Sequence, residues 1–158
     1  MNFKALCAAL VLAVAMPTGA QVPSKGAVET HLEVGKIVRA ADGRESIVSA
    51  ETAKPGDTLE YVVTYTNTSS EPVRDFTATL PIPAPTEFIP GSARPAAAKA
   101  SIDARVFDAM PLKRKVLKDG RNVDEDVALR EYHYLRWSVP ELGAKKTLTF
   151  VARVRVVE

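Results

Sequence analysis

Three aspartates that lie close together in the sequence, Asp119, Asp124 and Asp126, have the chemistry of a calcium site. Carboxylate oxygens are hard ligands of the kind that Ca²⁺ prefers. Their spacing does not match the calcium loop of an EF-hand, because Gly120 falls too early and no glutamate stands at the twelfth position. The sequence therefore predicts a turn at Asp119-Gly120 and a solvated polar loop over 122–126, and the three aspartates are weak candidates for a metal site.

Two histidines, His31 and His133, are the only imidazoles in the chain. A zinc site normally takes three or four protein ligands, and the single cysteine, Cys7, lies in an apolar N-terminal run. No G-x-S-x-G elbow frames a serine, and no glycine-rich phosphate loop occurs. We therefore expect exposed histidines on strands, no catalytic residue, no cofactor and no enzymatic activity. A hydrolase, the least favoured alternative, would have to join one histidine to a serine and an acid.

A basic run over 113–121 has the charge that attracts nucleic acid or lipid headgroups. No aromatic residue interrupts the run, although bases of a single strand would need aromatic side chains to stack on. The formal net charge of the chain is only +2, which gives no general attraction to nucleic acid. We expect an edge strand whose lysines prevent aggregation, and no nucleic-acid partner.

The elements that position these residues are predicted to be strands, because apolar and polar residues alternate with a period of two. The segment 59–66 is the strongest, since β-branched and aromatic residues fill it almost completely. The other segments predicted as strands are 28–34, 47–48, 73–80, 102–106, 113–118, 130–137 and 148–156, with a turn at 140–146.

Seven or eight short strands at this spacing, with turn residues between them and no helical period, are typical of an immunoglobulin-like β-sandwich. The alternating apolar faces would pack between two sheets. Trp137 is the expected centre of that core.

The first twenty residues are typical of a signal peptide. Lys4 precedes an uninterrupted apolar run over 5–16, which is too short to cross a bilayer. Small residues at 18 and 20 predict cleavage after Ala20. The organisation expected is a signal peptide over 1–20, a flexible leader over 21–27 and one domain over 28–158. No transmembrane segment is expected in the mature chain.

Several segments resemble the DUF11 conserved-repeat domain, in the order of that family's pattern. The first is the Lys-Pro-Gly-Asp turn at 54–57, followed by a strand that ends in Thr-Asn-Thr at 66–68. The remaining segments are 80–83, 88–93, 135–139, 142–144 and 148–150. Together they cover roughly residues 32–157. The resemblance implies an immunoglobulin-like fold on exported bacterial proteins, without assigned chemistry; this chain carries one copy and a long 93–128 segment.

The expected function is a non-enzymatic structural or protein-interaction domain in the periplasm or outside the cell, with a protein partner in the cell envelope. Loops carried on a rigid sandwich are where binding usually occurs, so the 93–128 segment is the expected contact region. The main alternative is a carbohydrate- or calcium-dependent binding module.

Overall fold

The structure, a computed structural model, describes residues 27–158, and its strands are all antiparallel. In chain order the elements of this part are β1 (Val28–Arg39), β2 (Glu45–Ser49), β3 (Thr58–Asn67), β4 (Val73–Pro81), β5 (Thr86–Phe88), β6 (Lys99–Ser101), β7 (Asp108–Ala109), β8 (Lys113–Lys118), β9 (Arg121–Asp126), a 3-10 helix η1 (Leu129–Glu131), β10 (Tyr134–Leu142) and β11 (Thr147–Val156).

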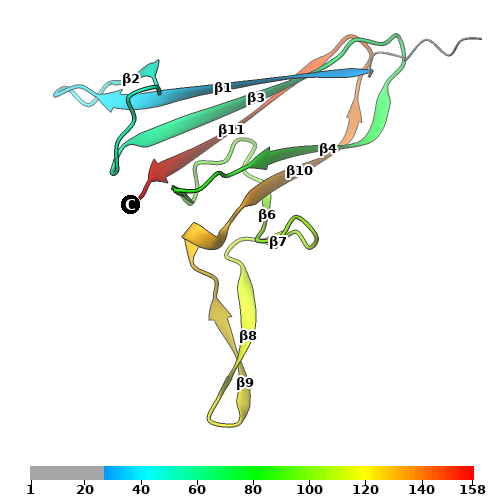
Figure 1. The fold of residues 1–158 in the computed structure, drawn as a ribbon. Helices are drawn as coiled ribbons and strands as arrows, with labels where there is room; N and C mark the ends of the chain where they lie inside the picture. The colour runs from blue at the N-terminus through cyan, green and yellow to red at the C-terminus, as the bar shows by residue number, and fades with distance from the viewer. Residues whose placement is uncertain (1–26) are drawn as a thin grey trace, which may run out of the picture.

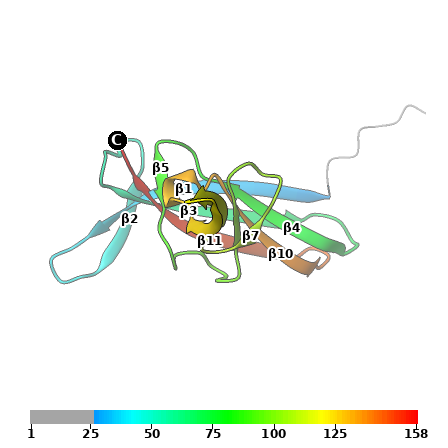
Figure 2. The ribbon, with the colours of Figure 1, turned by 90° about the horizontal axis from the view of Figure 1, so that it is seen from below.

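Two sheets form the body of the molecule. One has the strand order β2-β1-β3-β11-β5 and the other the order β4-β10-β6-β7. They face one another as two layers, while β8 and β9 form a separate two-stranded ribbon that projects away from both (Figure 1). Seen from below, the ribbon points toward the viewer from beneath the two layers (Figure 2). The predicted all-β, immunoglobulin-like sandwich is confirmed, although the described residues form more strands than the seven or eight expected.

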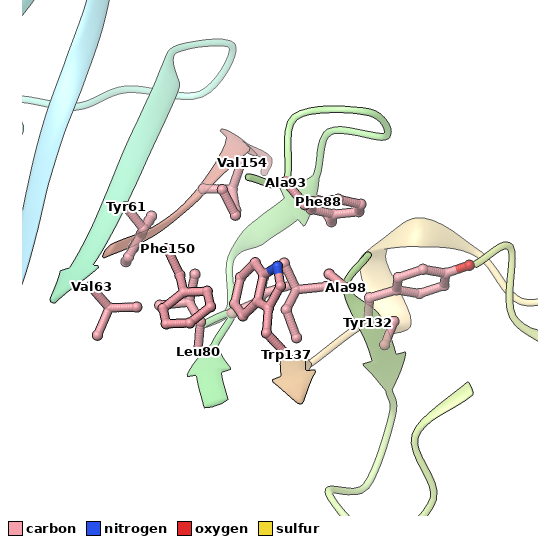
Figure 3. Close-up of a cluster of buried hydrophobic side chains, with 14 of the residues drawn as sticks. Tyr61, Val63, Leu80, Phe88, Ala93, Ala98, Tyr132, Trp137, Phe150 and Val154 are labelled. Atoms are coloured by element: carbon pink, nitrogen blue, oxygen red, sulfur yellow. The ribbon is translucent and has the colours of Figure 1, made fainter. Parts of the chain in front are cut away.

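The core lies between β3 and β11 on one side and β4 and β10 on the other. The predicted alternation in β3 is confirmed, since Leu59, Tyr61 and Val63 are buried. Trp137 is only 2% exposed, and its ring centroid lies 5.1 Å from that of Phe150 (Figure 3). Its indole N–H also donates a 2.7 Å hydrogen bond to the carbonyl oxygen of residue 95, so that the buried donor is satisfied.

The predicted strand over 102–106 is wrong, because side chains there capture the backbone N–H groups that a strand would use. The Ser101 hydroxyl accepts the N–H of Ala104 at 3.0 Å, and the Asp103 carboxylate accepts that of Arg105 at 2.9 Å. Such local hydrogen bonds compete with a sheet ladder. Ala104 consequently has a φ of 63°. The hydrogen bond that the Asp103 carboxylate accepts from the backbone of Arg105 holds the pKa of this carboxyl below its usual value.

Two boundaries around β10 also differ from the prediction. Its expected start near residue 130 is wrong, because η1 occupies 129–131 and β10 begins at Tyr134. The turn expected at 140–146 is shorter, because β10 continues through Pro140 to Leu142. Pro140 lacks an N–H for the ladder, and Asp75 stands opposite it with a φ of 49°. The irregular backbone of β4 at Asp75 therefore accommodates the proline in the neighbouring strand β10.

The predicted signal peptide and all but the last residue of the predicted leader lie outside the described residues. Among the described residues, no helix is long and apolar enough to span a membrane.

Candidate functional site

The projecting ribbon, residues 113–126, is a hairpin of β8 and β9 (Figure 1). Asp119 and Gly120 connect the strands with φ angles of 51° and 76°, both positive as a type I′ turn requires. The register pairs Lys113 with Asp126 and Lys118 with Arg121. Along β8 only Val116 is even partly buried, and along β9 only Glu125 is. The ribbon therefore presents both faces and both outer edges to solvent.

The two strands of the ribbon carry opposite charge. Lysines and an arginine dominate β8, while the second half of β9 is Asp124, Glu125 and Asp126. Lys113 pairs with Asp126 at 3.3 Å, and Lys118 pairs with Glu125 at 2.9 Å. The hydrogen bond from Lys118 holds the pKa of the Glu125 carboxyl below its usual value. Exposed pairs of this kind add little stability each, but they cancel much of the charge of the basic run.

The predicted edge strand with lysines is confirmed as β8. Among residues 27–158 it pairs only with β9, so one backbone edge has no partner strand. Three apolar residues lie near the tip of the ribbon. Val116 stands opposite Val123 on one face, and Leu117 is 73% exposed on the other. An aliphatic side chain in this position contributes nothing to the core and is available for contact with a partner.

The base of the ribbon is fixed to the sandwich by Tyr132, which is 1% exposed. Its ring stacks on that of Phe88 with a centroid distance of 6.4 Å (Figure 3). Its hydroxyl oxygen accepts the backbone N–H of Leu112 at 2.6 Å, immediately before β8. The N–H of Val127 then donates to the carbonyl of Leu112 at 2.9 Å and closes the ribbon. Because these contacts are buried, the ribbon leaves the body from a fixed point.

A second contact on the surface supports this base. The Arg114 guanidinium donates two hydrogen bonds to the Glu131 carboxylate, at 2.8 and 3.2 Å. This two-pronged geometry is the strong form of an arginine–carboxylate pair. The side-chain hydrogen bond from Arg114 holds the pKa of the Glu131 carboxyl below its usual value. The pair ties the start of β8 to η1.

A small hollow lies beside the base of the ribbon. Its volume is about 230 Å³, and Phe88, Pro90, Met110, Pro111, Leu129 and Tyr132 line it. The lining is mostly apolar, so the hollow has the size and chemistry to receive one apolar side chain of a partner. None of the lining residues that the structure describes there is a candidate nucleophile paired with a base.

The predicted polar loop over 122–126 is wrong, because these residues form most of β9. Asp119 lies in the turn, Asp124 stands opposite Lys115, and Asp126 pairs with Lys113. Within residues 27–158 no three histidine, cysteine, aspartate or glutamate side chains form a group that could hold a metal ion. Asp119 therefore forms part of the turn, and Asp126 takes part in an ion pair of the hairpin.

The two histidines lie apart. His31 is on the exposed face of β1, where Nε2 lies 3.1 Å from a Glu33 carboxylate oxygen. His133 is exposed just before β10, and its backbone N–H donates to the carbonyl of Ser101 at 2.9 Å. Neither imidazole forms a hydrogen bond with a serine side chain in the described part of the chain. The geometry thus offers no assembled triad.

The segments that carry the family resemblance have structural roles in the sandwich. Gly56 adopts a φ of 92°, and the Asp57 carboxylate accepts the N–H of Lys54 at 2.8 Å and pairs with Lys36 at 3.3 Å. The hydrogen bond from Lys54 holds the pKa of the Asp57 carboxyl below its usual value. The turn is also bonded to the end of β11 through the N–H of Gly56 and the carbonyl of Val156.

Asn67, at the centre of the Thr-Asn-Thr segment, is completely buried. Its amide nitrogen lies 2.7 Å from the carbonyl oxygen of Glu71, 3.1 Å from that of Leu142 and 3.2 Å from that of Gly143. Its carbonyl oxygen accepts the N–H of Ser69 at 3.0 Å. One side chain therefore joins two turns at one end of the sandwich.

Sequence reasoning missed β9 and the buried role of Tyr132. A signal for β9 was present, because the Asp-Gly turn separates a basic segment from one that ends in three consecutive acidic residues. No comparable signal marked Tyr132, since it lies in an alternating stretch that resembles a strand. No protein-family model, curated protein or solved structure matches this chain.

Proposed function

We propose that this chain is an exported, non-enzymatic protein-interaction domain of the cell envelope, and that the ribbon is its contact element. The observation that carries the proposal is a solvent-exposed ribbon fixed to the sandwich by the buried Tyr132–Leu112 hydrogen bond. A rigid base lowers the entropy that a binding element loses when it docks. Export is supported by Lys4 and the apolar run over 5–16.

Leu117 gives the sharpest test of the contact element, because it is 73% exposed at the tip of the ribbon. A photo-crosslinking residue placed at 117 in cells should capture a discrete partner. The same residue at Val106, which is 64% exposed but outside the ribbon, is the matched control. Capture at both positions, or at neither, would refute the ribbon as the contact element.

The variants Leu117→Asp and Val106→Asp complete this design. Each places one charge on a side chain that is already exposed, so both should keep the thermal midpoint of the parent protein. Only Leu117→Asp should abolish capture from a second ribbon position such as Arg121. Mass spectrometry of the exported protein tests the location, with a mature N-terminus at Gln21 as the expected result.

A further inference from the structure

The strand β1 has a long backbone edge that no described strand covers. Its pairing with β3 extends from Val28 to Ile37, but its pairing with β2, on the opposite side, covers only residues 35–39. Over residues 28–34, which we call the acidic edge, one row of N–H and C=O groups therefore has no partner strand among residues 27–158. Such an edge is a template for a strand from another chain.

The side chains of the acidic edge define what fits there. Residues paired across a sheet share a face, so Leu32 and Val34 lie on the same side as the buried Val63 and Tyr61. Yet Leu32 is 46% exposed and Val34 37% exposed. Their apolar surface continues the core-facing side of this sheet and is left partly exposed.

The opposite face of the same edge is acidic. Glu29 and Glu33 flank His31 there, and residues 28–34 contain no lysine or arginine. An added strand would therefore gain from basic side chains on one of its faces and an apolar side chain on the other.

The ribbon supplies such a strand. Its β9 edge carries Asp124, Glu125 and Asp126, which the acidic edge would repel, but its β8 edge carries Lys113 and Lys115. Lys115 forms no ion pair with another described residue. When Lys113 and Lys115 face the acidic side of β1, Val116 lies on the opposite face of β8 and meets Leu32 and Val34.

We propose that the partner of the ribbon is a second copy of this chain, whose acidic edge pairs with β8. This inference rests on the proposed function and names its partner. The contact joins two different surfaces, so each copy has one donor and one acceptor site. Association of this head-to-tail type builds a ring or an open chain of copies rather than a two-fold dimer.

A charge exchange between the two surfaces tests the proposal. Glu33→Lys and Lys115→Glu each change an exposed side chain. In a pure sample of either variant, positions 33 and 115 carry charges of the same sign and repel each other. Sedimentation velocity of the purified protein should show concentration-dependent association of the parent that weakens between about 0.02 M and 0.5 M salt. Either variant alone should associate at least about tenfold more weakly.

Mixing the two variants should restore the association. In the mixture, the new carboxylate at position 115 of one variant meets the new ammonium group at position 33 of the other. The unchanged Lys115 of the second variant meets the unchanged Glu33 of the first. Both contacts in an alternating assembly are then attractive. Glu51→Lys and Arg105→Glu make the same charge changes at exposed positions outside both surfaces, and their mixture should match the parent.

A backbone variant separates strand pairing from simple charge attraction. In the ribbon, the pair Lys118–Arg121 flanks a two-residue turn. Successive N–H groups along β8 point alternately to β9 and to the outer edge, and this alternation places the N–H of Lys115 at the outer edge. Lys115→Pro should remove that donor without breaking a bond within the ribbon. It should abolish association as Lys115→Glu does, but mixing with Glu33→Lys should not rescue it.

A parent protein that stays monomeric at low salt overturns the proposal. Association that neither single variant weakens, or a mixture that fails to restore it, also overturns the proposal. If the protein is monomeric but position 117 still captures a different protein in cells, the proposed function stands and only the self-association fails.

Discussion

The sandwich and the ribbon are held by different kinds of interaction. Trp137 and Phe150 lie in a fully buried apolar contact between two sheets. The ribbon has exposed ion pairs, one type I′ turn and a single buried attachment through Tyr132. Apolar burial supplies several kcal/mol per large side chain, whereas an exposed ion pair supplies roughly 0–1 kcal/mol. Stability is therefore concentrated in the sandwich, and the ribbon is left with exposed groups that can contact a partner.

The largest expected effect is at the centre of the sandwich. Trp137→Ala should lower the free energy of unfolding by about 3–5 kcal/mol, because it leaves a cavity and an unpaired carbonyl at residue 95. Chemical denaturation of the parent and the variant measures it. The comparison predicts that the matched truncation in the ribbon, Leu117→Ala, changes stability by less than about 0.5 kcal/mol. Similar losses of unfolding free energy in both variants would contradict the difference in stability between the sandwich and the ribbon.

A somewhat smaller effect is expected at the end of the sandwich. Asn67→Ala removes a buried amide that joins two turns and leaves the carbonyl oxygens of Glu71, Leu142 and Gly143 with fewer donors. We expect a loss of about 2–3 kcal/mol, measured in the same way. Asn67→Asp keeps the size but not the N–H donors, so it should be at least as destabilising as the alanine variant. Full stability of Asn67→Asp would contradict this role.

The attachment of the ribbon should show a local effect. Tyr132→Phe keeps the stacked ring but leaves the buried N–H of Leu112 without its acceptor, which should cost about 1–2 kcal/mol. Hydrogen exchange should accelerate in the ribbon and remain slow in β3 and β11. Uniform acceleration through all strands would show that the ribbon is part of the cooperative core.

The smallest effect is a pH dependence of the ribbon. The pKa values of Glu125 and Glu131 are lowered in the folded state by Lys118 and Arg114, respectively. A lowered pKa contributes stability that is present above the ordinary carboxyl pKa and is lost as the pH falls through the folded value. Exchange in the ribbon, corrected for its intrinsic pH dependence, should therefore increase at about pH 3 relative to about pH 6. Glu131→Gln should reduce the increase; an unchanged profile would count against the pair.

The same contrast explains what sequence could predict. Alternation identified β3, β4 and β11, because one face of each is buried against the other sheet and the pattern records that burial. It failed for β9, whose two faces are both exposed, so that no apolar period marks the strand. The alternation pattern failed again at Tyr132. The turn before this residue depends on backbone hydrogen bonds of η1, and such bonds cannot be recognised from the types of the side chains.

The candidate site was predictable only in outline. The long 93–128 segment was identified as unusual, and it contains the ribbon. Which of its residues contact a partner could not be derived, because the exposure of Leu117 and the open edge of β1 result from how distant strands pair. Conversely, the aspartates and histidines attracted attention through their chemistry, although the fold does not bring those that the structure describes together into a metal site or a triad.

The central claim is that the β8 edge of the ribbon binds the acidic edge of β1 in a second copy, while the rest of the sandwich only carries these two surfaces. Hydrogen exchange at single amides, followed as the protein concentration is raised, tests this most directly. The account predicts that the outward amides of Lys113, Lys115 and Leu117, together with amides of residues 28–34, become protected with concentration, while those of β3 and β11 do not change. Exchange at the β8 amides that is independent of concentration would contradict it.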